Sequence, residues 1–464
     1  MSEVVAASIW DRRRIAVTLG AVALIFLAAI ESLAVTTVMP VVSADLDGEA
    51  LFAVAFAGTL ATSVIGMVAA GAWSDARGPR GALYVAVSLF LIGLVISGVA
   101  TDMYVFLLGR LVQGLGTGGQ TVALYVVVAR LYPPQLHGRV FAAFAAAWVV
   151  PSMIGPFLAG AVAEFLHWRW AFLGVAVLTA LAFATIAVRL RGVDLGSGEG
   201  STVEHVWRRL GLAAIVATGA VVVGLTADFD DIRLGWVVAA ISITVIAFAA
   251  RPLLPIGTLR ARPGLPSVVL MRGIVAGAFF AGEAYIPNLL MNRFDFTPTW
   301  AGVALMFAAL AWAGASSLQG RYGDRLGNIR IAAIALTLVA IALAGVLLTA
   351  ALSLSPWVIV LGWALAGGGM GLLYPRLTVL TLAYSDARDQ GFNSSALSIS
   401  DSGGSAVTIA VAGLLFATVG GGAFGYIGVF ALCIGLLVIA SLPGRRLGHA
   451  AERKRPLTWS CAGQ

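Results

Sequence analysis

The sequence predicts an all-α integral membrane protein with fourteen transmembrane helices. Of its 464 residues, 60% are hydrophobic and only 11% are charged, whereas about a quarter of an ordinary soluble domain is charged. The charges fall between apolar runs, several of which exceed the ~18 residues typical of a membrane-spanning helix. In hydrocarbon each backbone group must bond within its own segment, so helices are expected and open strands are not. Soluble enzymes and secreted proteins are therefore excluded.

Charges, prolines and glycines bound the apolar runs and allow each span to be marked on the sequence. The even number of spans places both ends of the chain on one side of the membrane. The predicted spans are 15–39, 52–73, 82–100, 103–129, 140–163, 170–188, 210–226, 234–250, 268–291, 300–318, 330–352, 357–383, 394–418 and 422–442.

Two connections are longer than the others and mark the domain boundaries. They separate two six-helix bundles from an inserted pair of helices. The predicted segments are an N-terminus at 1–14, a first bundle at 15–188, a loop at 189–209, the inserted pair at 210–250, a linker at 251–267, a second bundle at 268–442 and a basic tail at 443–464.

The basic residues predict the orientation of the chain. On the side of the N-terminus lie 23 of the 29 Lys and Arg, against only Arg169, Arg233 and Arg293 on the opposite side. Because cytoplasmic loops are enriched in Lys and Arg, both termini are expected to be cytoplasmic. The positive charge is thus a topology signal, and no nucleic-acid partner is expected. A composition with one Lys among its basic residues suggests a GC-rich genome and the cytoplasmic membrane of a prokaryote.

An internal repeat of about 250 residues relates the two bundles. Parallel six-helix repeats that meet at a midplane site are typical of transporters that work by alternating access. The features that recur at nearly one offset are the glycines at 109, 114, 116 and 118 with those at 362, 367, 369 and 371, the Gly71/Asp75/Gly78 pattern with Gly320/Asp324/Gly327, and Glu31 with Glu283.

Ionisable residues inside the spans are the candidate functional groups, because such residues are rare in membranes and usually functional. We expect a role in proton coupling for them, and the alternative is that they neutralise one another as static pairs. Arg272 lies nearer the edge of its span, where its side chain could extend to the interface. The candidates are Glu31, Arg110, Glu283, Arg376 and Asp401.

Two loop motifs resemble those of the major facilitator superfamily, and within it of the fourteen-span drug:proton antiporters. The resemblance covers the chain from about Ile15 to Leu442. It implies loops that latch the outward-open state, in which Asp75 would cap the third helix and pair with an Arg across the bundle interface. The alternative is that both loops are only tight basic turns. The gating-loop residues are Gly71, Asp75, Arg77, Gly78 and Arg80 in the first copy and Gly320, Asp324, Arg325, Gly327 and Arg330 in the second.

Two further motifs of the same family lie within spans. Arg110, Gln113 and Gly114 resemble its fourth-span motif. The fifth span resembles the antiporter signature, in which a Gly-Pro pair makes a bendable helix contact, although Pro151 and Ala159 stand where glycines are usual. The matching residues of the fifth span are Pro151, Gly155, Pro156 and Gly160.

Together these features predict a proton-coupled transporter that exports amphiphilic or lipophilic small molecules. A lipid or natural-product exporter of the same fold is the alternative, and a membrane sensor that transports nothing is a third, although it would need no buried acids. No enzyme activity, cofactor or metal is expected, since no nucleophile–base pair or ligand set can be assembled from four histidines and two cysteines. The expected partners are the substrate, protons and the bilayer, and the protein is expected to act as a monomer.

Overall fold

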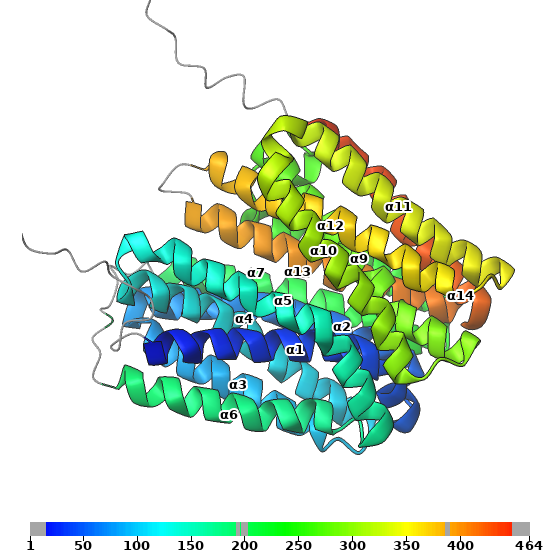
Figure 1. Cartoon of the computed structure of the whole chain (residues 1–464), viewed down its shortest axis with the longest axis horizontal. Helices are drawn as coiled ribbons and strands as arrows, with labels where there is room; N and C mark the ends of the chain where they lie inside the picture. Colours follow the sequence, from blue (N-terminus) through cyan, green and yellow to red (C-terminus); the bar gives the residue numbers. More distant parts are fainter. Residues whose placement is uncertain (1–14, 192–194, 196–202, 386–389, 448–464) are drawn as a thin grey trace, which may run out of the picture.

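The computed structural model describes residues 15–191, 195, 203–385 and 390–447. Within these ranges, fourteen helices are long and apolar enough to cross a membrane, and the described residues form helices, short 3-10 turns and loops without strands. The predicted fold of two six-helix bundles and an inserted pair is confirmed (Figure 1). The N-terminus at 1–14 and most of the tail at 443–464 lie outside the described residues.

The first bundle contains six long helices joined by short turns. Each extends a few residues beyond its predicted apolar run at one end or both, because polar residues at a membrane surface can still complete helical turns. The bundle comprises α1 (Ile15–Asp45), α2 (Phe52–Arg77), α3 (Pro79–Gly98), α4 (Met103–Leu131), α5 (Pro134–Phe165) and α6 (Trp170–Leu190).

The inserted pair and the second bundle follow the same pattern. The loop predicted at 189–209 is shorter than expected, since α6 ends at Leu190 and the next helix begins at Val203. The helices are α7 (Val203–Leu225), α8 (Ile232–Ala250), α9 (Leu265–Phe294), α10 (Pro298–Leu326), α11 (Asn328–Leu352), α12 (Trp357–Ala383), α13 (Gln390–Thr418) and α14 (Gly422–Arg445).

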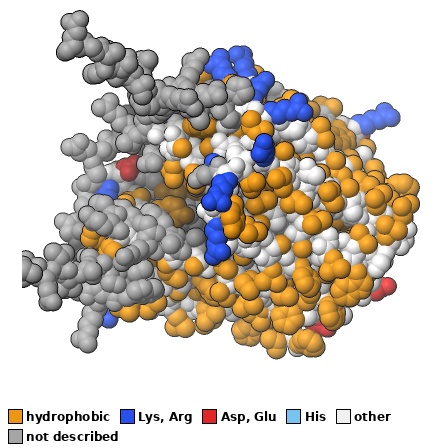
Figure 2. Space-filling model, turned by 45° about the horizontal axis from the view of Figure 1, so that its top comes forward, with side chains coloured by type: hydrophobic (Ala, Val, Ile, Leu, Met, Phe, Trp, Pro, Cys, Tyr) orange, Lys and Arg blue, Asp and Glu red, His pale blue; other side chains and the backbone are white. Residues whose placement is uncertain are grey.

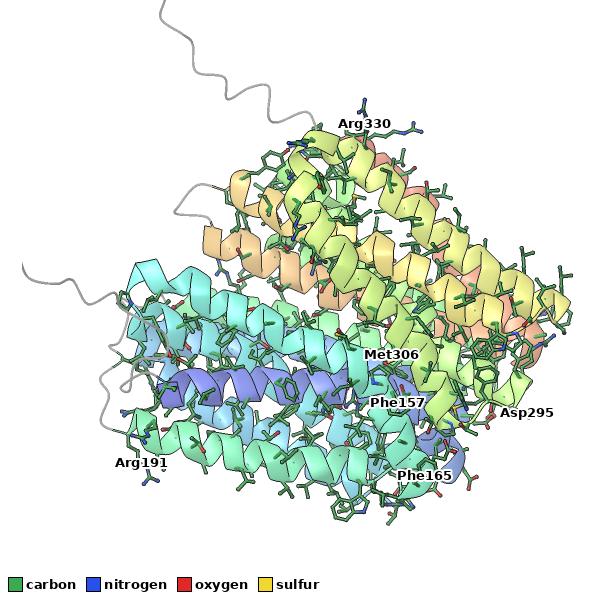
Figure 3. The ribbon with its side chains drawn as sticks, in the orientation of Figure 1. Phe157, Phe165, Arg191, Asp295, Met306 and Arg330 are labelled. Atoms are coloured by element: carbon green, nitrogen blue, oxygen red, sulfur yellow. The ribbon has the colours of Figure 1, made fainter. Side chains whose placement is uncertain are left out.

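The bundles meet along two helix pairs, α5 with α10 and α2 with α13, and α7 packs against both α2 and α13. The buried apolar side chains form two clusters. The larger draws on both bundles, whereas the smaller contains first-bundle residues, including Val17, Leu83 and Ile186, together with Leu195 of the loop after α6. The bundles diverge toward the end that carries Arg191 and Arg330 (Figures 1 and 3). We call this the arginine-rich end, and the other the opposite end.

The outer surface is suited to lipid. Large apolar side chains such as Leu181 and Leu361 are more than 60% exposed in the isolated chain. Figure 2 shows a largely hydrophobic surface, on which most of the visible Lys and Arg side chains lie across the top and centre of the view. In water such an extensive apolar surface would be unfavourable, so it is expected to face the bilayer.

Candidate functional site

A buried polar cluster joins α1 to α4 in the middle of the first bundle. Glu31 is 3% exposed, Arg110 4% and Gln113 fully buried. One guanidinium nitrogen of Arg110 pairs with the Glu31 carboxylate and donates to Gln113 Oε1 at 2.6 Å. Arg110 Nε donates to the carbonyl of Ala55 on α2 at 3.3 Å. The structure therefore brings three of the predicted residues into one cluster.

Glycines of α4 allow this cluster to form. A Cβ on Gly118 would collide with the Ser63 backbone of α2, and one on Gly114 would collide with the Thr59 backbone. Small residues allow helix backbones to approach closely in membranes, which brings Arg110 within reach of the α2 carbonyl. The repeated glycine pattern of the sequence thus has a packing role.

Gln113 has an unused hydrogen-bond donor. Its Oε1 accepts from Arg110, but its Nε2 is buried without a hydrogen-bond partner. Buried polar atoms are nearly always paired, so this amide is available to a water molecule or a substrate group. The Gln120 side chain, two turns further along α4, donates to the Leu24 carbonyl at 3.1 Å and has an unpaired Oε1.

The equivalent position of the second bundle is chemically different. Glu283 of α9 corresponds to Glu31, and Trp363 of α12 corresponds to Arg110. Trp363 is fully buried and stacks on Phe279 with ring centroids 5.2 Å apart. Its indole Nε1 is buried without a hydrogen-bond partner among the described residues. Among the described residues, Glu283 has no cationic partner within ion-pair distance.

A second, partly buried ion pair lies between α9 and α13. Arg272 Nε donates to Asp401 Oδ1 at 2.9 Å, and Tyr374 of α12 donates its hydroxyl to the same oxygen at 2.8 Å. The Arg272 guanidinium also lies 3.5 Å from the centre of the Tyr374 ring. Arg272 therefore does not extend to the interface, as its position near a span edge had suggested, because Asp401 holds it inside the bundle.

Arg376 pairs with neither Glu283 nor Asp401. Its Nε donates to Asn328 Oδ1 at 2.6 Å, where α11 begins. Glu283, Arg376 and Asp401, which the sequence grouped together, therefore do not form one cluster, since Asp401 pairs with Arg272 and Arg376 donates to Asn328.

In both gating loops the chain makes its turn at a glycine. Gly78 and Gly327 each precede a helix. Their own φ angles are 84° and 75°, a region that strongly favours glycine. Both are helix N-caps, and neither helix has a side-chain cap hydrogen bond. The expectation that Asp75 caps the third helix is therefore wrong. Because α2 runs to Arg77, Asp75 lies in its last turn instead of at the start of α3.

The Asp75 half of the predicted latch is not formed in this conformation. Asp75 is exposed and forms no ion pair among the described residues. The side chain of Asp324 lies outside the described part of the chain. Of the basic members, Arg80 donates to the Leu190 carbonyl within the first bundle at 3.3 Å, and Arg325 lies near the ring of Tyr322. The bundles diverge at this end, so a contact between them would need a different state.

The antiporter-like motif of α5 forms the close contact between the bundles. A Cβ on Gly160 would lie 2.7 Å from the carbonyl carbon of Pro298 on α10, and one on Gly302 would lie 2.6 Å from that of Pro156. The backbone N–H of Thr299 donates to Glu164 at 3.3 Å across the same contact. Gly155 is less crowded, since the nearest atom to its Cβ position lies 3.7 Å away on α1. Figure 3 shows Phe157 and Met306 where α5 and α10 cross.

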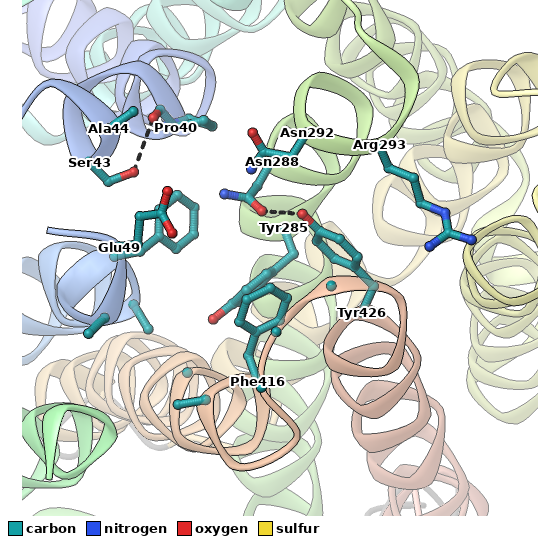
Figure 4. Close-up of a pocket in the computed structure, with 18 of the residues that line it drawn as sticks. Pro40, Ser43, Ala44, Glu49, Tyr285, Asn288, Asn292, Arg293, Phe416 and Tyr426 are labelled. Carbon is teal, nitrogen blue, oxygen red and sulfur yellow. Dashed lines mark hydrogen bonds between the residues drawn. The ribbon is translucent and has the colours of Figure 1, made fainter. Parts of the chain in front are cut away.

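A cavity of about 540 Å³ lies between the bundles at the opposite end (Figure 4). Phe52 of α2 contacts Tyr285 of α9, and Tyr285 contacts Phe416 of α13, each at 5.3 Å between ring centroids. Tyr426 and Asn288 share a hydrogen bond of 2.5 Å within the lining. These side chains come mainly from loop-proximal turns, so apolar periodicity gave no signal for the cavity.

Comparisons with known proteins give the family. Residues 21–409 match the model of the Major Facilitator Superfamily. "MFS transporter L2" of a Phoma species is 26% identical over 87% of this chain and 70% of its own length. An "Acurin A biosynthesis cluster MFS-type transporter" of Aspergillus aculeatus is 31% identical over 32% of this chain and 26% of its own. Most of the curated relatives are thus matched over less than two thirds of their length.

Solved structures share the fold. A peptide transporter POT in complex with alafosfalin superposes with a TM-score of 0.65 and 19% identity, covering 92% of this chain and 95% of that one. At that identity the likeness concerns the fold alone.

The comparisons correct the predicted location. The curated relatives come from fungi, among them Phoma, Schizosaccharomyces pombe and Aspergillus species, which indicates a eukaryotic source. The prediction of a prokaryotic cytoplasmic membrane is therefore wrong. It rested on the arginine bias, and base composition is a poor guide to the kind of cell.

The family match extends through both bundles and agrees with the fourteen-helix architecture. The chain belongs to the Major Facilitator Superfamily and is a membrane transporter, not an enzyme.

Proposed function

We propose that this transporter exports amphiphilic or lipophilic small molecules in exchange for protons. The observation that carries the proposal is the buried cluster of Glu31, Arg110 and Gln113. A buried ion pair rarely adds net stability, because desolvation offsets the attraction. Its presence at the centre of a membrane bundle therefore favours a functional role.

Protonation of Glu31 would couple the proton to the structure of the cluster. A neutral carboxyl group attracts the Arg110 guanidinium far less than a carboxylate does, so Arg110 would be freed to interact with a substrate. Substrate binding and proton binding would then compete for the same hydrogen-bonding groups, which is the requirement for exchange. Glu283 and the Arg272–Asp401 pair are further candidates for the proton path.

The helix contacts support alternating access. The bundles touch at the opposite end through Gly160 and Gly302 and diverge at the arginine-rich end, which we propose faces the cytoplasm. In the alternate state the α5–α10 contact would open, and Asp75 and Asp324 would pair with arginines across the closed arginine-rich end.

Natural-product export is the second candidate for the cargo. The relative from Aspergillus aculeatus is named for a biosynthesis cluster, which supports a lipophilic metabolite as the substrate. Both candidates use the same exchange mechanism and differ in the molecule that is carried. We propose that the protein acts as a monomer in either case.

A substrate-by-pH screen in inside-out membrane vesicles tests the proposal. A panel of lipophilic dyes and polyketides is offered with an imposed proton gradient, and accumulation is followed with and without an uncoupler. We expect at least one compound to accumulate and the accumulation to collapse with the uncoupler. Uptake that is indifferent to the proton gradient would contradict proton exchange, and Glu31→Gln vesicles provide the matched control.

A further inference from the structure

A small basic cavity lies in the linker that joins the inserted pair to the second bundle. It has a volume of about 310 Å³ and follows the end of α8 at Ala250. Arg251, Arg260 and Arg262 line it, and all three are exposed. Among the described residues that line the cavity there is no Asp or Glu. Three cations around one small cavity without a neutralising acid favour the binding of an anion there.

The backbone of the linker fixes the shape of the cavity. Gly257 has φ of 93°, and a Cβ there would collide with the side chain of Arg262. Thr258 is buried and donates its hydroxyl to the Pro255 carbonyl at 2.7 Å. Arg251 lies 4.3 Å from the ring centre of Phe248 on α8. The arginines are thus held around the hollow by local turn geometry and packing.

Apolar side chains adjoin these cations. Ile256 is 89% exposed and Leu259 is 44% exposed, and both line the same cavity. The linker lies where α8 and α9 reach the membrane surface, so these side chains are placed to contact acyl chains. A free inorganic anion would use only the arginines, whereas a phospholipid would use both groups.

We propose that this cavity binds the phosphate head group of an anionic phospholipid from the leaflet at the arginine-rich end. Guanidinium groups form bidentate hydrogen bonds with phosphate, and basic pockets on the cytoplasmic side of membrane proteins suit such head groups. The Ile256 and Leu259 side chains would lie against the acyl chains of the same lipid.

The bound lipid would also stabilise the linker against the second bundle. Arg446, just beyond α14, donates to the carbonyl of Ala261 at 2.6 Å and to that of Arg260 at 3.4 Å. The linker is therefore already attached to the end of α14. A phosphate shared by the three cavity arginines would hold the other side of the same loop.

Lipid binding to the purified full-length protein tests this site. Native mass spectrometry in a mild detergent measures binding of phosphatidylserine and of zwitterionic phosphatidylcholine. We expect phosphatidylserine to bind in preference, and the triple variant Arg251→Gln/Arg260→Gln/Arg262→Gln to weaken its binding about tenfold, the change that ~1.4 kcal/mol produces.

A matched control removes the same charge from the same end. Arg189, Arg191 and Arg208 are exposed, and their triple replacement by Gln should change phosphatidylserine binding less than about twofold, the scale of ~0.4 kcal/mol. Equal loss in both triple variants would mean that only the overall charge matters and would overturn the proposal. If the cavity triple variant does not fold, Arg260→Gln alone should still weaken binding measurably, and an unchanged affinity would overturn it.

The source of the phosphate is tested separately. Inorganic phosphate is added as a competitor at the concentrations used for phosphatidylserine. We expect little competition, because the ion makes no apolar contact. Complete displacement by the free ion at equal concentration would assign the cavity to a soluble anion and overturn the lipid identity. These readouts need no transport, so they are independent of the proposed exchange function.

Discussion

Replacing Gly160 by Ala should shift the transporter away from the conformation described above. The added Cβ would lie 2.7 Å from the Pro298 carbonyl carbon and 2.8 Å from the Thr299 Cα. Both are backbone atoms and cannot move aside by a rotamer change. The α5–α10 contact must therefore widen or lose stability wherever the opposite end is closed.

The size of the effect follows from packing energetics. Overpacking a well-packed contact costs about 1–3 kcal/mol. If the contact opens in the alternate state, that cost applies to one state only. A difference of this size changes the ratio of the two states by about 5- to 150-fold, so a minor state could become the major one.

Spin-label distance distributions provide the assay. One pair, at Phe165 and Phe424, reports the opposite end, and another, at Arg191 and Arg330, reports the arginine-rich end; all four residues are exposed. Gly160→Ala should lengthen the first distance and shorten the second.

Gly314→Ala is the matched control, because it lies on α10 and a Cβ there would meet no atom within 4 Å. Both distance distributions should match the wild type in this variant. Unchanged distributions in Gly160→Ala as well, with normal transport, would refute the role of this contact in closing the opposite end.

Three further variants probe the polar groups. Glu31→Gln should abolish proton-driven uptake in vesicles while substrate binding persists, and wild-type uptake in this variant would move the proton role to another acid. Asp401→Asn leaves the partly buried Arg272 with a neutral partner, so it should lower the apparent melting temperature; the loss is expected to be smaller than the about 3–5 kcal/mol of a fully buried pair, and an unchanged melting temperature would contradict a stabilising role for the pair. Asp75→Asn should slow turnover without weakening substrate binding, as measured by initial rates against equilibrium binding, and a normal rate would leave the loop as a tight turn only.

The helices and their grouping could be predicted from the sequence because both depend on local signals. An apolar run that is bounded by charge specifies a membrane helix without reference to any other part of the chain. The repeat relates Arg110 to Trp363 by sequence position alone. The cluster around Arg110 was only partly predictable, since each member was named but their meeting depended on how closely α4 packs on α2.

The remaining contacts depend on distant partners. Arg272 is only seven residues from the start of α9 and resembles an interfacial arginine, but its partner Asp401 lies 129 residues away. Asp75 was misplaced because α2 continues past its apolar run. Gly160 matched a motif, whereas the backbone it touches on α10 has no signal in the sequence of α5.

Proton movement driven by substrate tests the central claim most directly. Proteoliposomes are loaded with a compound that the vesicle screen identifies as transported and with an entrapped pH dye, and are diluted into substrate-free buffer without an imposed pH gradient. The account predicts that the lumen acidifies as the substrate leaves, and that Glu31→Gln abolishes the acidification while substrate exchange at equilibrium continues. Substrate efflux from wild-type liposomes with no change in luminal pH would contradict it.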